Sequence, residues 1–188
     1  GVYVDDGAIL VHERLAIVDP AGGSQPLLSE DGQLVLAVNG EIYNHEDIRD
    51  VLSEVRFATD SDTESAFRLV LRDGSAALHE VRGMFALAMA HTDGRGAVAR
   101  DPIGIKPLYY AETGRRFRFA SSLPALLQGG DIAKTLDAVA LNHYLNFHAV
   151  VPAPRTLLAG VEKLPPATWM RIDANGKVEQ KTWWMLQF

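Results

Sequence analysis

The chain has 188 residues, of which 47% are hydrophobic and 22% are charged, a balance that supports one folded domain and excludes intrinsic disorder. The net charge of −6, with no cluster of Lys or Arg, gives no support for nucleic-acid binding. No apolar run approaches the roughly 18 residues that would span a bilayer, so we expect no membrane partner.

Cysteine is absent, which excludes disulfides, zinc–thiolate sites and thiol catalysis by these 188 residues. The six His residues show no HxxxH or similar spacing, so no metal site is expected. No charged-then-apolar signal segment opens the chain, and a cytoplasmic location is expected. The opening GVYVDDGAILVHE starts in the middle of a strand-and-turn pattern, which indicates a chain entered part-way.

Strand patterns dominate the first part of the chain. Residues 8–18 are rich in β-forming side chains, end at Asp19-Pro20, and place Arg14 in a strand. A loop over residues 21–27 leads to a stronger strand over residues 33–38, which stops at Asn39-Gly40.

Two helices follow. Asn44 is expected to cap the first helix, whose apolar residues recur with helical spacing. These residues are Ile48, Val51, Leu52 and Val55. Ser61 and Glu64 fit a capping box at the start of the second helix, which ends at Gly74.

The second half of the chain indicates three antiparallel hairpins, around the turns DGRG (93–96), TGRR (113–116) and DANG (173–176). Helices over 123–127 and 138–144 and a proline-stiffened linker over 150–155 separate the last two. Near-continuous apolar strands indicate sheets covered on both faces, and the hairpins exclude a doubly wound parallel fold. We therefore predict an α+β fold, a four-layer α-β-β-α sandwich of two mainly antiparallel sheets.

The Asn39-Gly40 pair carries the first chemical signal. Asn and Gly both tolerate positive φ, so a plain turn is one interpretation. A hairpin turn, however, is followed directly by a strand, whereas here a helix cap follows. An Asn carboxamide and a Gly N–H can also act as the two hydrogen-bond donors of an oxyanion hole, because glycine has no Cβ to block the approach of a substrate.

Arg14 and Asp62 add two charged groups to this signal. Arg14 is interpreted either as a surface arginine paired with Glu13 or Asp19, or as a partly buried group that binds a ligand carboxylate. Asp62 fits an ordinary helix cap, although an Asp in a first turn can also receive an ammonium group. Together with Asn39-Gly40, they describe a pocket for an α-amino acid whose side-chain carbonyl is attacked.

Six ordered motifs connect this chemistry to a family. They are HERLAIVD, AVNGEIYNH, SDTE, RGMFALA, ARDPIGIKPLYY and KLPPATWMRID followed by WW, and they run through nearly the whole chain. In this order they resemble the glutaminase domain of asparagine synthetase–type class II glutamine amidotransferases. The resemblance implies the N-terminal-nucleophile hydrolase fold, an α-β-β-α sandwich. ARDPIGIKPLYY is interpreted as structural, with Arg100 and Asp101 paired inside a turn.

The resemblance also implies roles for individual residues. Asn39 and Gly40 would form the oxyanion hole. The α-carboxylate of glutamine would be held by Arg14, helped by the backbone of Ile17 and Val18. Its α-amino group would be held by Glu41 and Asp62.

The sequence departs from the family at the nucleophile. The family uses a cysteine at the mature N-terminus, whose own α-amine acts as general base, whereas residue 1 here is Gly and nothing matches the family's CGI to RGPD opening. Either these residues omit an N-terminal piece of the natural protein, or the domain has lost its nucleophile and become a scaffold, as in the similar β-lactam synthetases. In both cases the polypeptide as written is predicted to have no glutaminase activity.

The resemblance sets further expectations for partners. Residues 1–188 would be an N-terminally incomplete glutaminase domain that takes glutamine and is covalently linked to a synthetase domain after residue 188. That second domain would use ATP and Mg²⁺ to amidate aspartate or another acid, whereas no cofactor is expected in these residues, which have no P-loop. A homodimer is a candidate assembly, although the sequence carries no signal for it.

Three function classes remain open at this point. The first is a glutaminase that feeds ammonia to a synthetase, and the second is a non-catalytic scaffold that supports a synthetase. The third is a general binding module of mixed α/β class. Under this hypothesis the ordered motifs would be a coincidence.

Overall fold

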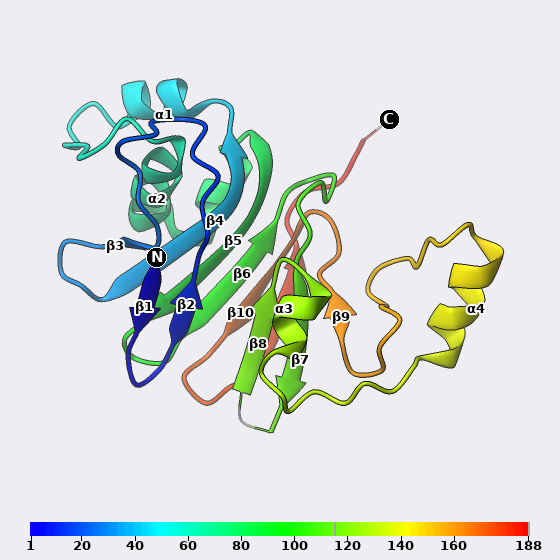
Figure 1. Cartoon of the computed structure of the whole chain (residues 1–188). Coiled ribbons are helices and arrows are strands. Elements are labelled where there is room, and N and C mark those ends of the chain that lie inside the picture. The colour runs from blue at the N-terminus through cyan, green and yellow to red at the C-terminus, as the bar shows by residue number, and fades with distance from the viewer. Residues whose placement is uncertain (115, 188) are drawn as a thin grey trace.

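An antiparallel sheet of six strands forms the centre of the protein. The computed structural model describes residues 1–114 and 116–187, and the strand order of this sheet is β11-β10-β6-β5-β4-β3 (Figure 1). The strands are β3 (Leu27–Leu28), β4 (Leu34–Ile42), β5 (Gly83–His91), β6 (Gly96–Arg100), β10 (Thr168–Ile172) and β11 (Val178–Thr182). β4 and β5 pair along their whole length, and β4 contains the Asn39-Gly40 pair.

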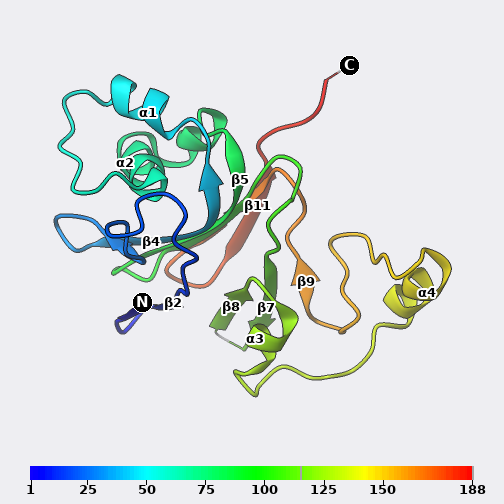
Figure 2. The ribbon, with the colours of Figure 1, turned by 45° about the horizontal axis from the view of Figure 1, so that its top comes forward.

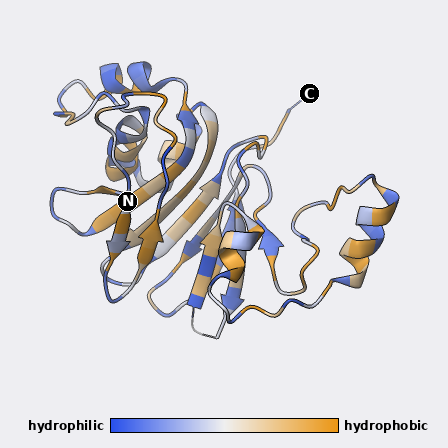
Figure 3. Cartoon of the chain, viewed as in Figure 1, coloured by the Kyte–Doolittle hydropathy of each residue, from blue (hydrophilic) through white to orange (hydrophobic). Residues whose placement is uncertain are grey.

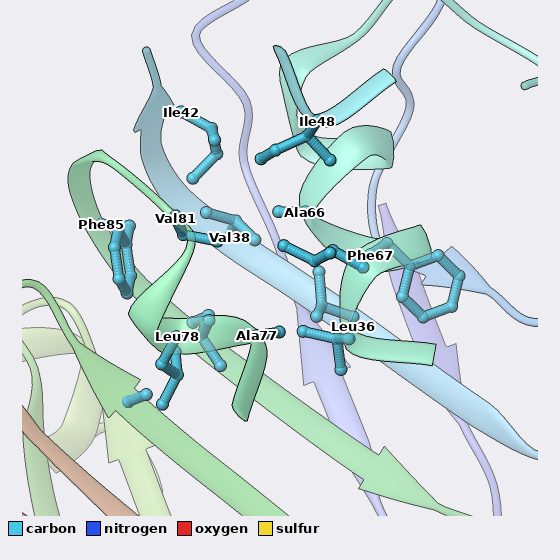
Figure 4. Close-up of a cluster of buried hydrophobic side chains, with 14 of the residues drawn as sticks. Leu36, Val38, Ile42, Ile48, Ala66, Phe67, Ala77, Leu78, Val81 and Phe85 are labelled. Atoms are coloured by element: carbon cyan, nitrogen blue, oxygen red, sulfur yellow. The ribbon is translucent and has the colours of Figure 1, made fainter. Parts of the chain in front are cut away.

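Helices cover one face of this sheet. They are α1 (His45–Val51), α2 (Asp62–Asp73) and a 3₁₀ helix, η1 (Gly74–His79). Val38 and Ile42 of β4 belong to the same buried cluster as Ile48 and Phe67 of the helices (Figure 4). Burial of such side chains contributes about 1.5–3 kcal/mol each, which ties α1 and α2 to β4.

A second β layer lies against the opposite face of the central sheet. It contains a hairpin of β1 (Val2–Val4) and β2 (Ile9–Val11), together with a three-stranded sheet in the order β8-β7-β9. The strands of that sheet are β7 (Tyr109–Thr113), β8 (Arg116–Ala120) and β9 (Glu162–Lys163). Leu10 and Tyr110 from this layer share a buried cluster with Val35, Ala88 and Met170 of the central sheet, so apolar packing joins the two layers.

A short helix, α3 (Leu123–Leu127), packs on the outer side of the three-stranded sheet. Its Leu126 is buried with Ala111 and Val161, which gives a third buried cluster. The layers therefore run from helices through the central sheet and the second β layer to a helix, as two views show (Figure 1, Figure 2). The predicted α+β, four-layer sandwich is confirmed.

Between Ile132 and Leu158, which both pack in the third buried cluster, the chain makes a long excursion that carries α4 (Ala138–Asn146), and this helix lies apart from the sheets (Figure 1). Ala140 is buried, but the helix exposes several apolar side chains, among them Leu145 at 72%. Stretches of α4 have the colour of hydrophobic residues in Figure 3. A helix of this length is marginal in water on its own. Capping by Asp137, whose carboxylate accepts the Ala140 amide at 2.9 Å, supports its first turn.

Two strand predictions are wrong. The predicted strand over residues 8–18 is confined to β2, and Arg14 lies in the loop that follows. Leu15 and Ile17 are 84% and 57% exposed, so no buried face stabilises a longer strand. β4 also does not stop at Asn39-Gly40 but runs through it, because β5 offers a continuous antiparallel partner.

The cap of α1 differs from the prediction in its contacts. Asn44 precedes the helix as expected, but its carboxamide accepts the Arg82 amide at 2.8 Å and donates to the Glu80 carbonyl at 2.9 Å. The helix ends at Val51, before the predicted Val55. Asn44 therefore connects the start of α1 to the segment before β5 and does not cap its own helix.

The cap of α2 is half as predicted. Ser61 accepts the Thr63 amide at 3.3 Å, as an N-cap residue should. Glu64 does not close the capping box, because its carboxylate accepts the amides of Ala58 and Thr59 instead. The helix ends at its C-cap glycine, as the sequence indicated.

The three predicted hairpins are found as β5–β6, β7–β8 and β10–β11, and the two later helices as α3 and α4. Arg115, which belongs to the predicted TGRR turn, lies outside the described residues.

The predicted pairing of Arg100 with Asp101 is wrong, although both organise the predicted turn. The guanidinium group donates to the carbonyls of Gly104, Lys106 and Leu164. The Asp101 carboxylate accepts the amides of Ile103, Ile105 and Lys106. Asp101 therefore satisfies amides within its own loop, while Arg100 bonds carbonyls of that loop and of the distant Leu164, and neither side chain is needed as a partner for the other.

Candidate active site

The second half of β4 has an open edge. β3 contains only Leu27–Leu28 and covers the first half of the strand. Beyond it, side chains bond the backbone groups that face away from β5. The Val38 amide donates to Gln25 Oε1 at 2.6 Å, and the Ile42 amide donates to Asp62 Oδ2 at 2.8 Å.

Gly40 lies in the middle of this open edge. Alternate residues of a strand direct their N–H and C=O groups to the same side, and Val38 and Ile42 direct theirs away from β5. The register agrees, because Gly40 lies opposite Phe85, whose carbonyl turns to the other side and accepts the Asp101 amide at 2.8 Å. The Gly40 N–H is therefore directed away from β5, out of the open edge of β4.

Only glycine fits at position 40. Its φ is +151°, and a Cβ there would lie 2.0 Å from the Met84 carbonyl oxygen and 2.7 Å from Phe85 Cα. Both contacts are with backbone, which cannot rotate away. The glycine thus allows a close approach of two strands, and the plain-turn interpretation of Asn39-Gly40 is wrong.

Asn39 and Glu41 direct their side chains to a different side. Val38 and Ile42 face the helices, so the alternating Asn39 and Glu41 face the second β layer. Both side chains are half-buried. Asn39 and Gly40 are thus neighbours in β4, but the Asn39 side chain, like that of Glu41, leaves the strand on the face of the sheet, whereas the Gly40 N–H lies at its edge.

The Arg14 guanidinium organises the loop after β2. It donates to three carbonyls of that loop, those of Val18, Asp19 and Gly22. Gly23 brings the loop against α2, since a Cβ there would lie 2.7 Å from Ser61 Oγ and 2.9 Å from Arg14 Nη2. Val18 is thus engaged through its carbonyl, whereas Ile17 is 57% exposed.

An open cavity of about 320 Å³ lies beside Arg14. Its lining comes from the N-terminus and the loop, namely Gly1, Arg14, Ala16, Pro20, Ala21, Gly22, Ser24 and Gln25. The volume suits a small polar molecule. Because Gln25 also holds the Val38 amide, the cavity borders the strand edge that carries Gly40.

Asp62 begins α2 and closes the far end of the open edge. Its side chain is buried, with Oδ1 3.5 Å from the hydroxyls of Ser61 and Thr63 and Oδ2 on the Ile42 amide. The N-terminus of this 12-residue helix favours a negative charge at that position. Asp62 therefore already has a structural role, and a ligand ammonium group would share its carboxylate with the Ile42 amide.

Two residues that sequence reasoning missed, His12 and Gln25, complete the open edge. His12 Nε2 lies 3.0 Å from the Val38 carbonyl oxygen. Burial is the main cause that lowers the pKa of His12, and the positive charges of Gly1 and Arg14 act in the same direction, whereas the bond to Val38 raises it. His12 stands inside the motif HERLAIVD, which was a signal, but nothing in the loop sequence distinguishes Gln25.

A second cavity, of about 340 Å³, lies between η1 and the central sheet, with Leu78, Met89 and Trp169 in its lining. It contains none of the predicted site residues. Among residues 1–114 and 116–187, no three His, Asp or Glu side chains gather as a metal site would require. In the same residues no helix has the length and apolar character to cross a membrane.

Comparison with known proteins identifies relatives of this chain. A family model described as a glutamine amidotransferase domain matches residues 1–184. Asparagine synthetase (glutamine-hydrolyzing) 1 of Bacillus subtilis is 35% identical over all of this chain and 30% of its own length. Asparagine synthetase B (glutamine-hydrolyzing) of Escherichia coli is 40% identical over 77% of this chain and 26% of its own length. The chain thus spans less than a third of these relatives.

Solved structures support the fold independently. Glutamine phosphoribosylpyrophosphate amidotransferase from B. subtilis superposes with a TM-score of 0.60, over 86% of this chain and 32% of its own, at 22% identity. An allosteric regulatory enzyme of purine biosynthesis superposes with a TM-score of 0.64, over 93% of this chain and 35% of its own, at 24% identity. At such identities the likeness concerns the fold, of the N-terminal-nucleophile hydrolase type. The chain belongs to the class II glutamine amidotransferase family, on its asparagine synthetase branch.

Proposed function

We propose that this domain binds glutamine and hydrolyses its side-chain amide, supplying ammonia to an ATP-dependent, asparagine synthetase–like amidation of a carboxylate. One observation carries the proposal. The Gly40 N–H faces an open strand edge, with the Arg14 loop and its cavity on one side and the Asp62 carboxylate on the other. A cation, an anion and a backbone donor along one strand edge would suit the two ends and the reacting carbonyl of glutamine.

Glutamine would bind through its charged end. Arg14 has five N–H donors, of which its contacts with the loop use three, so two remain for the α-carboxylate. Ile17 and Val18 would help through their backbone. Glu41 and Asp62 would hold the α-ammonium group, Asp62 from the helix terminus.

The reacting end would be stabilised by Asn39 and Gly40. As a nucleophile attacks the amide carbon, negative charge develops on the carbonyl oxygen, and the Asn39 carboxamide and the Gly40 N–H would donate to it. One such donor is worth about 2.7–4 kcal/mol of barrier. When the tetrahedral intermediate collapses, the C–N bond breaks, the nitrogen takes up the proton released by the nucleophile and ammonia leaves, and water then hydrolyses the acyl group to give glutamate.

The nucleophile is not among these 188 residues, because they contain no cysteine. We therefore infer that the polypeptide by itself releases no ammonia from glutamine, although it can bind glutamine. A covalently linked synthetase domain is supported by the length of the relatives, of which this chain covers 30% and 26%. ATP and Mg²⁺ would belong to that domain, and no cofactor would belong to this one.

A second candidate function is a scaffold that has lost its nucleophile and supports a synthetase. The absence of cysteine from these residues is the observation that favours it. The two functions differ in glutamine binding, because a scaffold has no use for the Arg14 loop and the open edge of β4.

The test is glutamine titration of the 188-residue protein by calorimetry, with intact-mass and ammonia-release measurements on the full-length natural protein. We expect binding by the wild type, loss of binding in Arg14→Ala, and no change in Arg171→Ala, an exposed arginine that forms a surface ion pair with Glu179. A wild type that fails to bind glutamine supports the scaffold. Ammonia release by the 188-residue protein itself would contradict the inferred need for a cysteine.

A further inference from the structure

The open edge of β4 is held by side chains in place of a strand. In the β3–β4 ladder, Leu27 lies opposite Leu36 and Leu28 opposite Val35. Continuing this register places Gln25 opposite Val38. The Gln25 backbone does not pair there, but its side chain does, and Oε1 accepts the Val38 amide at 2.6 Å.

His12 bonds the other half of the same residue. Its Nε2 lies 3.0 Å from the Val38 carbonyl oxygen, which can only accept, so Nε2 carries the proton and donates. Its Nδ1 is buried and has no hydrogen-bond partner among the described residues. Both polar backbone groups of Val38 are therefore fixed from two different segments of the chain.

The two contacts control the backbone immediately before the oxyanion donors. The Val38 carbonyl belongs to the peptide unit that ends in the Asn39 nitrogen, and the next peptide unit carries the Gly40 N–H. On the far side the Ile42 amide is fixed by Asp62. The backbone of Asn39 and Gly40 is thus held at Val38, by His12 and Gln25, and at Ile42, by Asp62.

Gln25 also links this point to α2. It is buried, and its Nε2 lies 3.3 Å from Thr63 Oγ1, in the first turn of the helix. One carboxamide thus joins the strand that carries Gly40 to the helix that carries Asp62. The relative position of these two groups depends on this bridge.

We propose that Gln25 and His12 are positioning residues of the glutaminase reaction, which replace a missing strand at Val38 and thereby aim the Asn39 and Gly40 donors at the reacting carbonyl. This inference rests on the proposed function. A purely structural role is the alternative, since any buried backbone group requires a hydrogen-bond partner. The two readings differ in whether the loss falls on kcat or on stability alone.

Ser29 supplies the matched control for this difference. Its hydroxyl accepts the Leu34 amide of β4 at 2.9 Å, which is the same kind of bond at the opposite end of the strand. Ser29→Ala should lower stability without changing kcat. Gln25→Met removes the acceptor at nearly constant volume, and His12→Phe removes the donor, whereas His12→Gln keeps a donor.

The experiment measures glutamine hydrolysis, melting temperature and hydrogen exchange of residues 34–42 in the full-length natural protein. For Gln25→Met and His12→Phe we expect kcat to fall by roughly 10–100-fold with KM for glutamine within about twofold of wild type. Exchange of the β4 segment should become faster in both variants. His12→Gln should recover most of the lost kcat.

The inference alone would be overturned by a Gln25→Met variant with wild-type kcat, or by a Ser29→Ala variant whose kcat falls as far as that of Gln25→Met. A fall in affinity with unchanged exchange would also overturn it, because Gln25 would then contact the substrate directly. A wild-type protein without glutaminase activity contradicts the proposed function first, and the inference fails with it. The wild-type activity is measured before any variant, so a failure of the proposed function is distinguished from a failure of this inference.

Discussion

The Asp62 carboxylate accepts the Ile42 backbone amide at 2.8 Å, so the first residue of α2 closes the end of the open edge of β4. This contact gives Asp62 a structural role that charge alone would not reveal. Asp62→Ala leaves a buried amide without its acceptor, and we expect it to lower the free energy of unfolding by about 1–3 kcal/mol. Chemical denaturation of the 188-residue protein measures this change.

Asp62→Asn separates that structural role from the proposed binding role. The Asn side chain keeps an oxygen that can accept the Ile42 amide, but it has no charge for the glutamine ammonium group. We expect stability close to wild type and glutamine affinity reduced at least about tenfold. An Asp62→Asn protein that binds glutamine as the wild type does would remove Asp62 from the binding site.

Substitution of Gly40 tests the close approach of β4 and β5. A Cβ at Gly40 meets the Met84 carbonyl oxygen at 2.0 Å, so Gly40→Ala must separate two paired strands in the middle of the sheet. We expect no cooperative unfolding transition, as judged by near-UV circular dichroism and a thermal melt. Gly32→Ala is the control, because Gly32 has φ +70° but no atom within 4 Å of its added Cβ. It should cost only about 1 kcal/mol, for the backbone conformation.

These positions show which parts of the fold the sequence could predict. The strands β4 and β5 are long apolar runs, and the hairpins carry their own turn residues, so local patterns were enough. The position of Asn39-Gly40 inside β4 could not be predicted, because the strand continues only where β5 offers a partner far along the chain. Local sequence at Asn39-Gly40 is that of a turn.

The sequence predicted which residues belong to the candidate site better than it predicted what those residues contact. Motif resemblance named Arg14 and Asp62, but their main contacts are with loop carbonyls and with the Ile42 amide, which depend on how the chain folds back. Gln25 had no signal at all. Its role arises only because β3 ends early and leaves Val38 without a strand partner.

The pH dependence of stability tests the environment of His12. The pKa of His12 is lowered, chiefly by burial, and the nearby charges that act on it are the Gly1 ammonium group and Arg14. The unfolded chain therefore binds a proton more readily than the folded one. The stabilisation is fully present above the unfolded pKa of about 6.5 and is lost as the pH falls below it through the lowered folded pKa.

Melting temperatures between about pH 7.5 and pH 5 measure this effect, in a range above the pKa of ordinary carboxylates. We expect the wild type to lose stability as the pH falls and His12→Gln, which cannot titrate, to lose less. Carboxylates whose pKa is lowered, such as Asp5 and Asp31, act only at still lower pH. Equal slopes in the two proteins would show that His12 is not held neutral at the Val38 carbonyl.

Trp183 and Trp184 form a matched pair for testing how the end of the chain is anchored. Trp183 is 8% exposed, stacks on Phe85 with ring centroids 6.3 Å apart, and meets His79 edge-on at 5.9 Å. Trp184 is 39% exposed. Trp183→Ala should lower the free energy of unfolding by about 3–5 kcal/mol, whereas Trp184→Ala should change it by less than about 0.5 kcal/mol.

Trp183→Phe refines this prediction. The indole N–H of Trp183 is buried without a hydrogen-bond partner among the described residues, so its removal forfeits no bond, and the ring that stacks on Phe85 is kept. The loss should therefore be well below that of Trp183→Ala. Because Phe85 lies directly opposite Gly40 in the ladder, the same substitutions probe the support behind the proposed oxyanion donor. Equal melting temperatures for Trp183→Ala and Trp184→Ala would show that the chain end does not brace β5 at that point.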